Sequence, residues 1–417
     1  MQSIGYYIHK VNTLPPDAIF RKLFRKTNVK VKTKVNRYRA KTLGTKLSDE
    51  DLFKAVEHEE LRIRSLSDFI DHFRKRREPK FFINHAQKHE ILKIIQKDFP
   101  DLIEKIITDA DQICEHIFDL LGSGHTSVAS KMNRIKKIEI EDNFESFNPM
   151  DWHIDFKTGY RWDSKTYFED IEIPYGKGDI KIPWELSRFQ HIPTLGKAYG
   201  ICQKLRTENK QKNPAKYASE FMNQIEHWID NNPVEFGVNW TCPMDVAIRA
   251  VNWIFGFYFF INAKEIPDKF WIKFLRILFL HGRFIRRNLE IGYDDRDKRI
   301  TSNHYLSDIV GLIFLGIFFK DAQEGKAWLN FGVKELIGEM EFQIHPDGTD
   351  FESSIPYHRL VLELFVTSAI LCQLNGIELS QKFWERLEKM FGFVMYYTKP
   401  DGGAPQIGDN DSGRVWI

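Results

Sequence analysis

The chain of 417 residues is long enough for two or three structural units and a large buried core. Its formal net charge is only +2, which excludes a molecule that holds a polyanion by bulk charge alone. Apolar residues make up 42% of the chain, and its two most apolar stretches, 251–261 and 309–319, are too short to span a bilayer. We therefore expect no transmembrane segment and a helical core that contains most of the aromatic residues.

The cysteines and the N-terminus bear on the compartment. The four cysteines, Cys114, Cys202, Cys242 and Cys372, form no CxxC pair, which indicates free thiols in a reducing compartment. The first residues contain no apolar run after a basic start, so no secretory signal is visible. The sequence predicts a cytoplasmic protein, or a periplasmic or secreted one if this N-terminus is not the native one.

The first zone, residues 1–140, is charged, and apolar positions recur at helical spacing in 49–73, 85–99 and 101–121. Ten Lys or Arg and no acid lie between Arg21 and Lys41, and a second basic cluster spans 74–77. Such a basic helical arm is typical of contact with an acidic polymer, a membrane surface or nucleic acid, and equally of a solvated helix. We expect no nucleic-acid partner.

The second zone, residues 141–181, has short aromatic and polar alternations with Pro and Gly, and we interpret it as an irregular connection with short strands. Helices dominate the third zone, residues 182–417. Their expected ranges are 184–205, 213–230, 242–262, 267–290, 303–319, 325–343, 354–375 and 380–398. Consecutive helices with short connections form antiparallel hairpins. Periodicity alone does not distinguish a toroid of such hairpins from an open solenoid or a bundle.

Polar residues gather at the predicted helix starts. Glu185 and Arg188 lie three positions apart on one helix face, where they either form a structural salt bridge or line a groove. Arg249 and Asn252 occur on an otherwise apolar helix. Because their burial costs free energy unless they are hydrogen-bonded, they either line a polar groove or belong to an internal network.

Two later helix starts have the same character. A Thr-Ser pair can cap the helix that begins near residue 303, which places Asn303 and His304 in a first turn that favours a nearby anion. A Ser-Ser pair and Pro356 open the helix near 354, so Tyr357 also lies at a helix start. Capping and packing alone also explain these residues.

Five segments in this order resemble the heparinase II/III and alginate lyase group of polysaccharide lyases. They are KIPWELSRFQ, GVNW, SNHYL, QIHPDGTDFESSIPYH and PQIGDNDSGR. The resemblance covers about residues 140–417 and is looser before them. It implies an (α/α) toroid of helical hairpins followed by a β-sandwich, and cleavage of uronic-acid-containing polysaccharides by β-elimination. Because the chain ends where the resemblance would lead into the β-sandwich, we expect that domain to be absent from this chain.

The resemblance also implies residue roles. Asn303 and His304 match the pair that engages the uronate carboxylate, and Tyr357 matches the tyrosine that protonates the leaving oxygen or acts as base. A tyrosine base would need a lowered pKa, for which His304 or His358 could supply positive charge. The expected substrate-binding residues are Glu352, His358, Arg188, Glu185, Asn239 and Arg249. We expect no cofactor and no metal, except a structural metal in the β-sandwich, which usually supplies a further catalytic His or Tyr.

Three alternatives to a lyase remain open. The chain could be a helical module that binds acidic glycans without catalysis, or an intracellular protein of polysaccharide assembly. A glycoside hydrolase on a similar toroid would need two opposed carboxylates, for which Glu185, Glu352 and Asp409 are available. The anionic polysaccharide partner is common to the lyase and the binding module.

Overall fold

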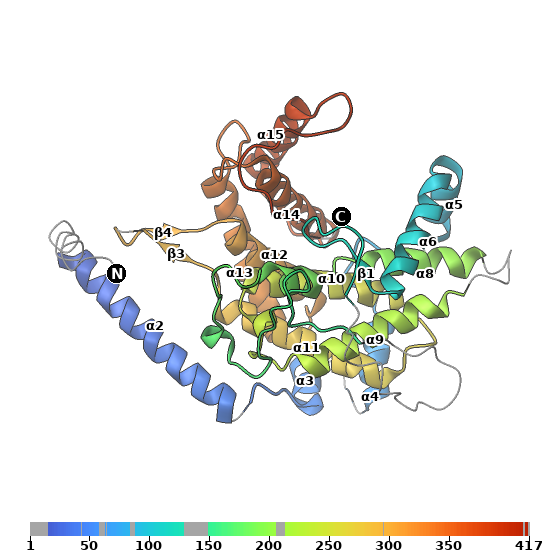
Figure 1. The fold of residues 1–417 in the computed structure, drawn as a ribbon, viewed down its shortest axis with the longest axis horizontal. Coiled ribbons are helices and arrows are strands. Elements are labelled where there is room, and N and C mark those ends of the chain that lie inside the picture. The colour runs from blue at the N-terminus through green and yellow to red at the C-terminus, as the bar shows by residue number, and fades with distance from the viewer. Residues whose placement is uncertain are drawn as a thin grey trace.

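The computed structural model describes residues 16–42, 44–57, 63, 65–83, 88–128, 149–205, 213–294, 296–411 and 413–415, and this part of the chain is mainly helical (Figure 1). The N-terminal zone contains α2 (Pro16–Thr42), α3 (Asp49–Val56), α4 (Leu66–Lys75), α5 (Lys88–Asp98), α6 (Pro100–Cys114), β1 (Ile117–Phe118) and β2 (Thr126–Ser127). Two short 3-10 turns are η3 (Phe168–Asp170) and η4 (Val238–Trp240). The later elements are α7 (Lys181–Ser187), α8 (Ile192–Leu205), α9 (Ala215–Asn231), α10 (Pro243–Phe260), α11 (Asp268–Arg287), β3 (Gly292–Tyr293), β4 (Arg299–Ile300), α12 (Asn303–Phe318), α13 (Gln323–Gln343), α14 (Ile355–Leu374) and α15 (Gln381–Tyr397).

The helices from α8 onward pack as antiparallel hairpins. The pairs α8/α9, α10/α11, α12/α13 and α14/α15 are each in contact, and α6, α8, α10, α12 and α14 are neighbours in that order. One row of helices is therefore backed by a second row, which confirms the prediction of an (α/α) toroid. The only described strands are two antiparallel two-residue pairs, β1 with β2 and β3 with β4.

The core lies where α10 and α12 cross their neighbours. Both helices are buried on nearly every face, as their almost unbroken apolar sequences require. Glycines allow the closest approaches: a Cβ on Gly311 would lie 2.7 Å from the Cβ of Ala247, and one on Gly316 would lie 2.6 Å from the backbone nitrogen of Leu329. These glycines bring α12 against both α10 and α13, so the start of α12 has little freedom to move.

Two predicted helices are broken in the structure. The expected helix over 184–205 is two helices, because the backbone reverses after α7 at Phe189, whose φ is +57°. The buried Phe189 ring holds this reversal in the core, and Pro193 lies in the first turn of α8. The expected helix over 49–73 is likewise divided into α3 and α4, each capped by its own serine, Ser48 and Ser65.

The basic cluster at 74–77 attaches the N-terminal zone to the toroid. Arg74 donates to Asp268 at the start of α11 (2.7 Å), and Arg76 donates to the carbonyl of Phe318 (2.8 Å). The Arg76 guanidinium also lies over the rings of Phe73 and Phe318. Through these contacts Arg74 and Arg76 fix α4 to the toroid. The predicted domain boundary near residue 140 lies in 129–148, outside the described residues.

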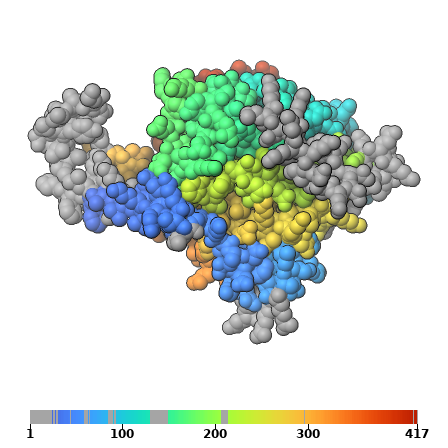
Figure 2. Space-filling view, turned by 60° about the horizontal axis from the view of Figure 1, so that its bottom comes forward, coloured from blue at the N-terminus to red at the C-terminus, as the bar shows by residue number. Residues whose placement is uncertain are grey.

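The helix α2 contains the basic run 21–41, although the side chains of 16–23, 25, 26 and 28–30 are outside the described part. Near its C-terminal end, Arg37 and Lys41 pair with Asp170 at 2.5 and 3.7 Å, and Lys32 donates to the carbonyl of Arg287. Figure 2 shows this helix in blue beside the green segment around residues 150–180. The described part of the arm therefore contacts the body between Lys32 and Lys41, while the side chains of Lys34 and Arg39 are exposed.

Length and composition would allow α14 to cross a membrane. However, 72% of its most apolar window is buried inside the protein, as in the core helix of a toroid. Length and apolar composition alone are weak evidence for a membrane span, since buried core helices meet the same criteria.

Candidate active site at the helix ends

A small cavity of about 60 Å³ lies where several helices begin. It is formed by α7, by the first turns of α10, α12 and α14, and by the C-terminal segment near residue 411. The lining residues are Lys181, Trp184, Glu185, Arg188, Cys242, Met244, Asp245, Asn303, His304, Tyr357, Leu360, Asp411 and Gly413. Five predicted site residues thus meet at one place: Tyr357, Asn303, His304, Glu185 and Arg188.

Asn303 is held by Glu352 through three hydrogen bonds. The Asn303 backbone N–H donates to Glu352 Oε1 at 2.8 Å, and its Nδ2 donates to both carboxylate oxygens at 2.9 Å. Asn303 opens α12, whose N-cap Ser302 accepts from the backbone N–H of His304. Glu352 does not line the cavity, so in this structure it orients Asn303, whereas we expected it to bind substrate directly.

His304 is oriented by a different acid. Its Nδ1 lies 2.9 Å from Glu290 Oε1, just beyond the end of α11. Burial alone would lower the pKa of His304, but the hydrogen bond and the charge of Glu290 outweigh burial and hold the pKa above its ordinary value. Glu290 is itself fixed, because Oε2 accepts from the Met244 N–H and its own N–H donates to Asp308, each at 2.8 Å.

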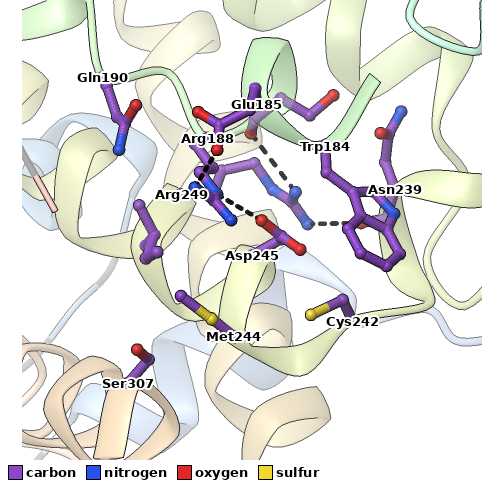
Figure 3. A network of polar contacts seen from close by, with 12 residues as sticks. Trp184, Glu185, Arg188, Gln190, Asn239, Cys242, Met244, Asp245, Arg249 and Ser307 are labelled. Carbon is purple, nitrogen blue, oxygen red and sulfur yellow. Dashed lines mark hydrogen bonds and ion pairs between the residues drawn. The ribbon is translucent and has the colours of Figure 1, made fainter. Parts of the chain in front are cut away.

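Arg188 is fixed between two buried acids (Figure 3). Its Nη1 donates to Glu185 and its Nε to Asp245, the latter at 2.5 Å. Burial opposes the charge of Arg188, but the two carboxylates outweigh it and raise the pKa of the guanidinium. The cavity wall therefore contains a permanent cation whose geometry is set by two partners.

Tyr357 faces an acid and not a cation. Its hydroxyl donates to Asp411 Oδ2 at 2.7 Å, and Lys181 pairs with the other oxygen of Asp411 at 2.6 Å. Burial, followed by the hydrogen bond to Asp411, raises the pKa of Tyr357 well above its ordinary value of 10. A phenol with a raised pKa keeps its proton at neutral pH, so Tyr357 is not set up as a base in this arrangement.

Three of the predicted substrate-binding residues, Arg249, Asn239 and His358, are buried and do not line the cavity. Arg249 is fully buried, lies over the rings of Trp228 and Trp240, and donates to the carbonyl of Asn239. Burial lowers the pKa of Arg249 to about 9. The sequence left two alternatives open for Arg249, a polar groove and an internal network, and the structure places it in an internal network.

Asn239 and His358 are likewise buried and lie outside the cavity lining. Asn239 Nδ2 donates to the carbonyl of Trp152 and to Asn232 Oδ1, both at 2.8 Å. His358 is 1% exposed, and its Nε2 donates to the carbonyl of Met390 at 3.2 Å. Since His358 faces α15, it supplies no charge to Tyr357.

Several cavity residues were missed by the sequence analysis. Asp245 and Asp411 complete the partners of Arg188 and Tyr357. Asp411 lies in the PQIGDNDSGR segment, and Asp245 follows GVNW by five positions. Cys242 follows GVNW by two positions, whereas Glu290 lies in none of the five segments. Cys242, Glu290 and His304 form a group whose donor atoms lie within 4.8 Å of one another, so these residues could hold a metal ion.

A larger hollow of about 430 Å³ lies between the residue 44–46 loop and α11. Five cations line it, Arg39, Lys46, Arg283, Arg286 and Arg287, together with Glu324. Arg283 pairs with Glu324 and Arg287 with Glu235, whereas no ion pair to Arg39, Lys46 or Arg286 occurs within the described ranges. This hollow contains none of the predicted site residues.

The fold and the cavity together define a class: a helical toroid with an Asn-His pair, a buried arginine and a tyrosine at one cluster of helix starts. Residues 63–415 match the family described as Heparinase II/III N-terminus, and the chain belongs to that family.

The relatives have one name in common. The chain is 25% identical over 354 residues to the heparin-sulfate lyase of Bacteroides stercoris, a match that spans 77% of this chain and 50% of that protein. It is 22% identical over 239 residues to the heparin-sulfate lyase of Pedobacter heparinus, covering 56% and 33% of the two chains. The chain thus spans about half the length of the curated relatives it matches.

Solved structures show the same fold. A crystal structure of heparinase III superposes with a TM-score of 0.55 at 17% identity and covers 86% of this chain and 47% of the other. A second heparinase III structure gives 0.51 at 21% identity, with 82% and 45% covered. At these identities the superposition supports the helical architecture alone.

Proposed function

We propose that this chain forms the helical part of the active site of a lyase that cleaves a uronic-acid-containing, anionic polysaccharide by β-elimination. The observation that carries the proposal is the convergence of Tyr357, Asn303 and His304, distant in the sequence, on one cavity with Arg188. Membership of the heparinase II/III family and the names of the heparin-sulfate lyase relatives support it.

The chemistry requires stabilisation of a doubly negative species. Removal of the C5 proton of a uronate places new negative charge beside its carboxylate, so N–H donors aimed at that carboxylate lower the barrier. Asn303 can supply one when a single amide hydrogen is shared between the two Glu352 oxygens, because the second hydrogen of the amide then stays available. His304 has Nε2 available, since Glu290 takes Nδ1. The charge of Arg188 is already balanced by Glu185 and Asp245, so Arg188 shapes the cavity wall and adds no net positive charge.

Tyr357 acts as the acid in this proposal. Breaking the C4–O4 bond requires a proton for the departing oxygen, and the hydroxyl of Tyr357 retains its proton at neutral pH. In this structure the hydroxyl hydrogen is directed at Asp411, so donation to the departing oxygen requires the hydroxyl to turn from Asp411 to the substrate. The C5 proton passes to a base, which the family resemblance assigns to the β-sandwich that follows the toroid.

The test uses Tyr357→Phe, which keeps the ring and removes the proton. The substrates are heparan sulfate, alginate and hyaluronan, and the ultraviolet absorbance of the new C4–C5 double bond reports the rate of cleavage. This rate should be about 10²- to 10⁴-fold lower in Tyr357→Phe than in the wild type. Tyr396→Phe, an exposed tyrosine on α15, is the matched control and should leave the rate unchanged. An unchanged rate in folded Tyr357→Phe would remove Tyr357 from the mechanism.

The arginine-lined hollow favours one alternative, a module that binds acidic glycans without cleaving them. That function predicts salt-sensitive binding with no new double bond, and loss of binding when Lys46 and Arg286 are changed to Glu. A hydrolase has less support, since Glu185 is paired with Arg188 and Glu352 with Asn303.

A further inference from the structure

We infer that Cys242, Glu290 and His304 form a binding site for one Zn²⁺ ion at the wall of the cavity. The Cys242 sulfur lies 3.8 Å from His304 Nδ1 and 3.7 Å from Glu290 Oε2, and His304 Nδ1 lies 2.9 Å from Glu290 Oε1. The three residues come from separate parts of the chain, and their donor atoms all lie within 4.8 Å of one another.

These separations fit a tetrahedral zinc centre. Zn–S bonds of about 2.3 Å and Zn–N and Zn–O bonds of about 2.0–2.2 Å place the donor atoms about 3.3–3.6 Å apart. The sulfur must therefore approach by a few tenths of an ångström, and the His304–Glu290 pair must open by a similar amount. Without an ion, the hydrogen bond between His304 and Glu290 occupies the same space.

The ligand set selects zinc among the common cations. A thiolate and an imidazole are poor ligands for Mg²⁺ and Ca²⁺, which take oxygen, but they suit Zn²⁺ well. One thiolate and one carboxylate also neutralise the two charges of the ion, which suits a partly buried position. The charge of nearby Arg188 is already paired with Glu185 and Asp245, so it does not leave an unbalanced cation beside the site.

The surrounding structure holds the ligands in place. Cys242 is the N-cap of α10 and is 4% exposed, and His304 lies in the first turn of α12. Glu290 is held by the Met244 N–H on one side and by Asp308 on the other. Such second contacts orient metal ligands in known zinc sites. Because Cys242 and His304 line the cavity, the fourth position of the ion would open to it for water or a substrate oxygen.

The test measures metal binding by the full chain. Chelator treatment first removes bound metal, and a reducing agent keeps the cysteine thiols reduced. Calorimetric titration with Zn²⁺ should show one site, which Cys242→Ser and Glu290→Gln should each weaken by more than about 10-fold. Co²⁺ in place of Zn²⁺ should give a sulfur-to-cobalt charge-transfer band in the near ultraviolet, absent in Cys242→Ser. Cys114→Ser, a half-buried thiol outside the group, is the matched control and should retain both signals.

Absence of zinc binding in the wild-type chain, or equal binding by folded Cys242→Ser, would overturn the inference. If circular dichroism shows that Cys242→Ser is unfolded, the cobalt spectrum of the wild-type chain decides: no charge-transfer band means that no thiolate is bound. The binding test needs no turnover, so a negative result leaves the proposed lyase function untouched, and an inactive chain can still bind zinc.

Discussion

At the scale of single residues, Glu352 has the most specific consequence. It accepts three hydrogen bonds from Asn303 and does not line the cavity, so we expect it to act through Asn303 as a positioning residue. In Glu352→Gln, a side-chain amide would meet the amide of Asn303, and one of the two donors would lose its acceptor. We expect kcat to fall by about 10- to 100-fold with little change in KM, because the contact matters most in the transition state.

Steady-state kinetics on the best substrate of the lyase assay measures this split. Glu352→Asp should recover part of kcat, since it keeps a carboxylate near Asn303. Glu341→Gln, in an exposed ion pair with Lys382 on the neighbouring helices, is the matched control and should match the wild type. A rise in KM with kcat unchanged would contradict the positioning role and indicate direct substrate contact.

At the scale of elements, the loop between α13 and α14 carries a buried acid with a perturbed pKa. Burial, with a smaller contribution from the charge of Glu352, raises the pKa of Asp350 from 3.8 to about 7. The folded state therefore binds a proton that the unfolded chain has already lost between pH 4 and pH 7. The free energy of unfolding should therefore fall as pH rises through this window, by at most about 1.4 kcal/mol per pH unit.

Asp350→Asn removes this titration while keeping the shape of the side chain. We expect the variant to be more stable than the wild type at pH 8, by an amount on the order of 1–4 kcal/mol. At pH 4 both folded side chains are neutral and the unfolded Asp350 is about half ionised, so the difference should shrink to within about 0.6 kcal/mol. Urea unfolding at the two pH values measures it, and a difference of equal size at both would show that the Asp350 charge is not its cause.

At the scale of the whole molecule, α4 joins the N-terminal zone to the toroid through Arg76. The guanidinium donates to the carbonyl of Phe318 and lies over two phenyl rings, and its side chain is 7% exposed. Arg76→Ala should lower the free energy of unfolding by about 2–4 kcal/mol, since it removes a buried charged hydrogen bond and cation–π contacts.

Denaturant unfolding gives the size of the Arg76 effect, and hydrogen exchange in α4 shows where it acts. Faster exchange in α4 than in α10 would indicate that the N-terminal zone detaches before the toroid unfolds. Lys75→Ala, in an exposed ion pair with Asp71, is the matched control and should change stability by less than about 0.5 kcal/mol. Equal effects of both substitutions would contradict the anchoring role of Arg76.

The helices and their starts followed from local sequence. Apolar spacing gave the ranges of α9 to α15 to within a few residues, because burial against a neighbouring row imposes a helical period. Capping Ser and Thr residues placed Asn303 and Tyr357 in first turns, and the ordered motifs gave the toroid. The break at Phe189 escaped prediction, since a positive φ held by core packing has no local signal.

Only the tertiary structure decided which polar residues share the cavity. Arg188 and Arg249 are both buried arginines in helical sequence, but one pairs with two acids in the cavity wall and the other is enclosed by tryptophans. Asp411 and Glu290 became partners of Tyr357 and His304 through the packing of elements distant in the sequence. The physical reason is that periodicity reports which face of a helix is buried, whereas the partner of a buried charge depends on long-range packing.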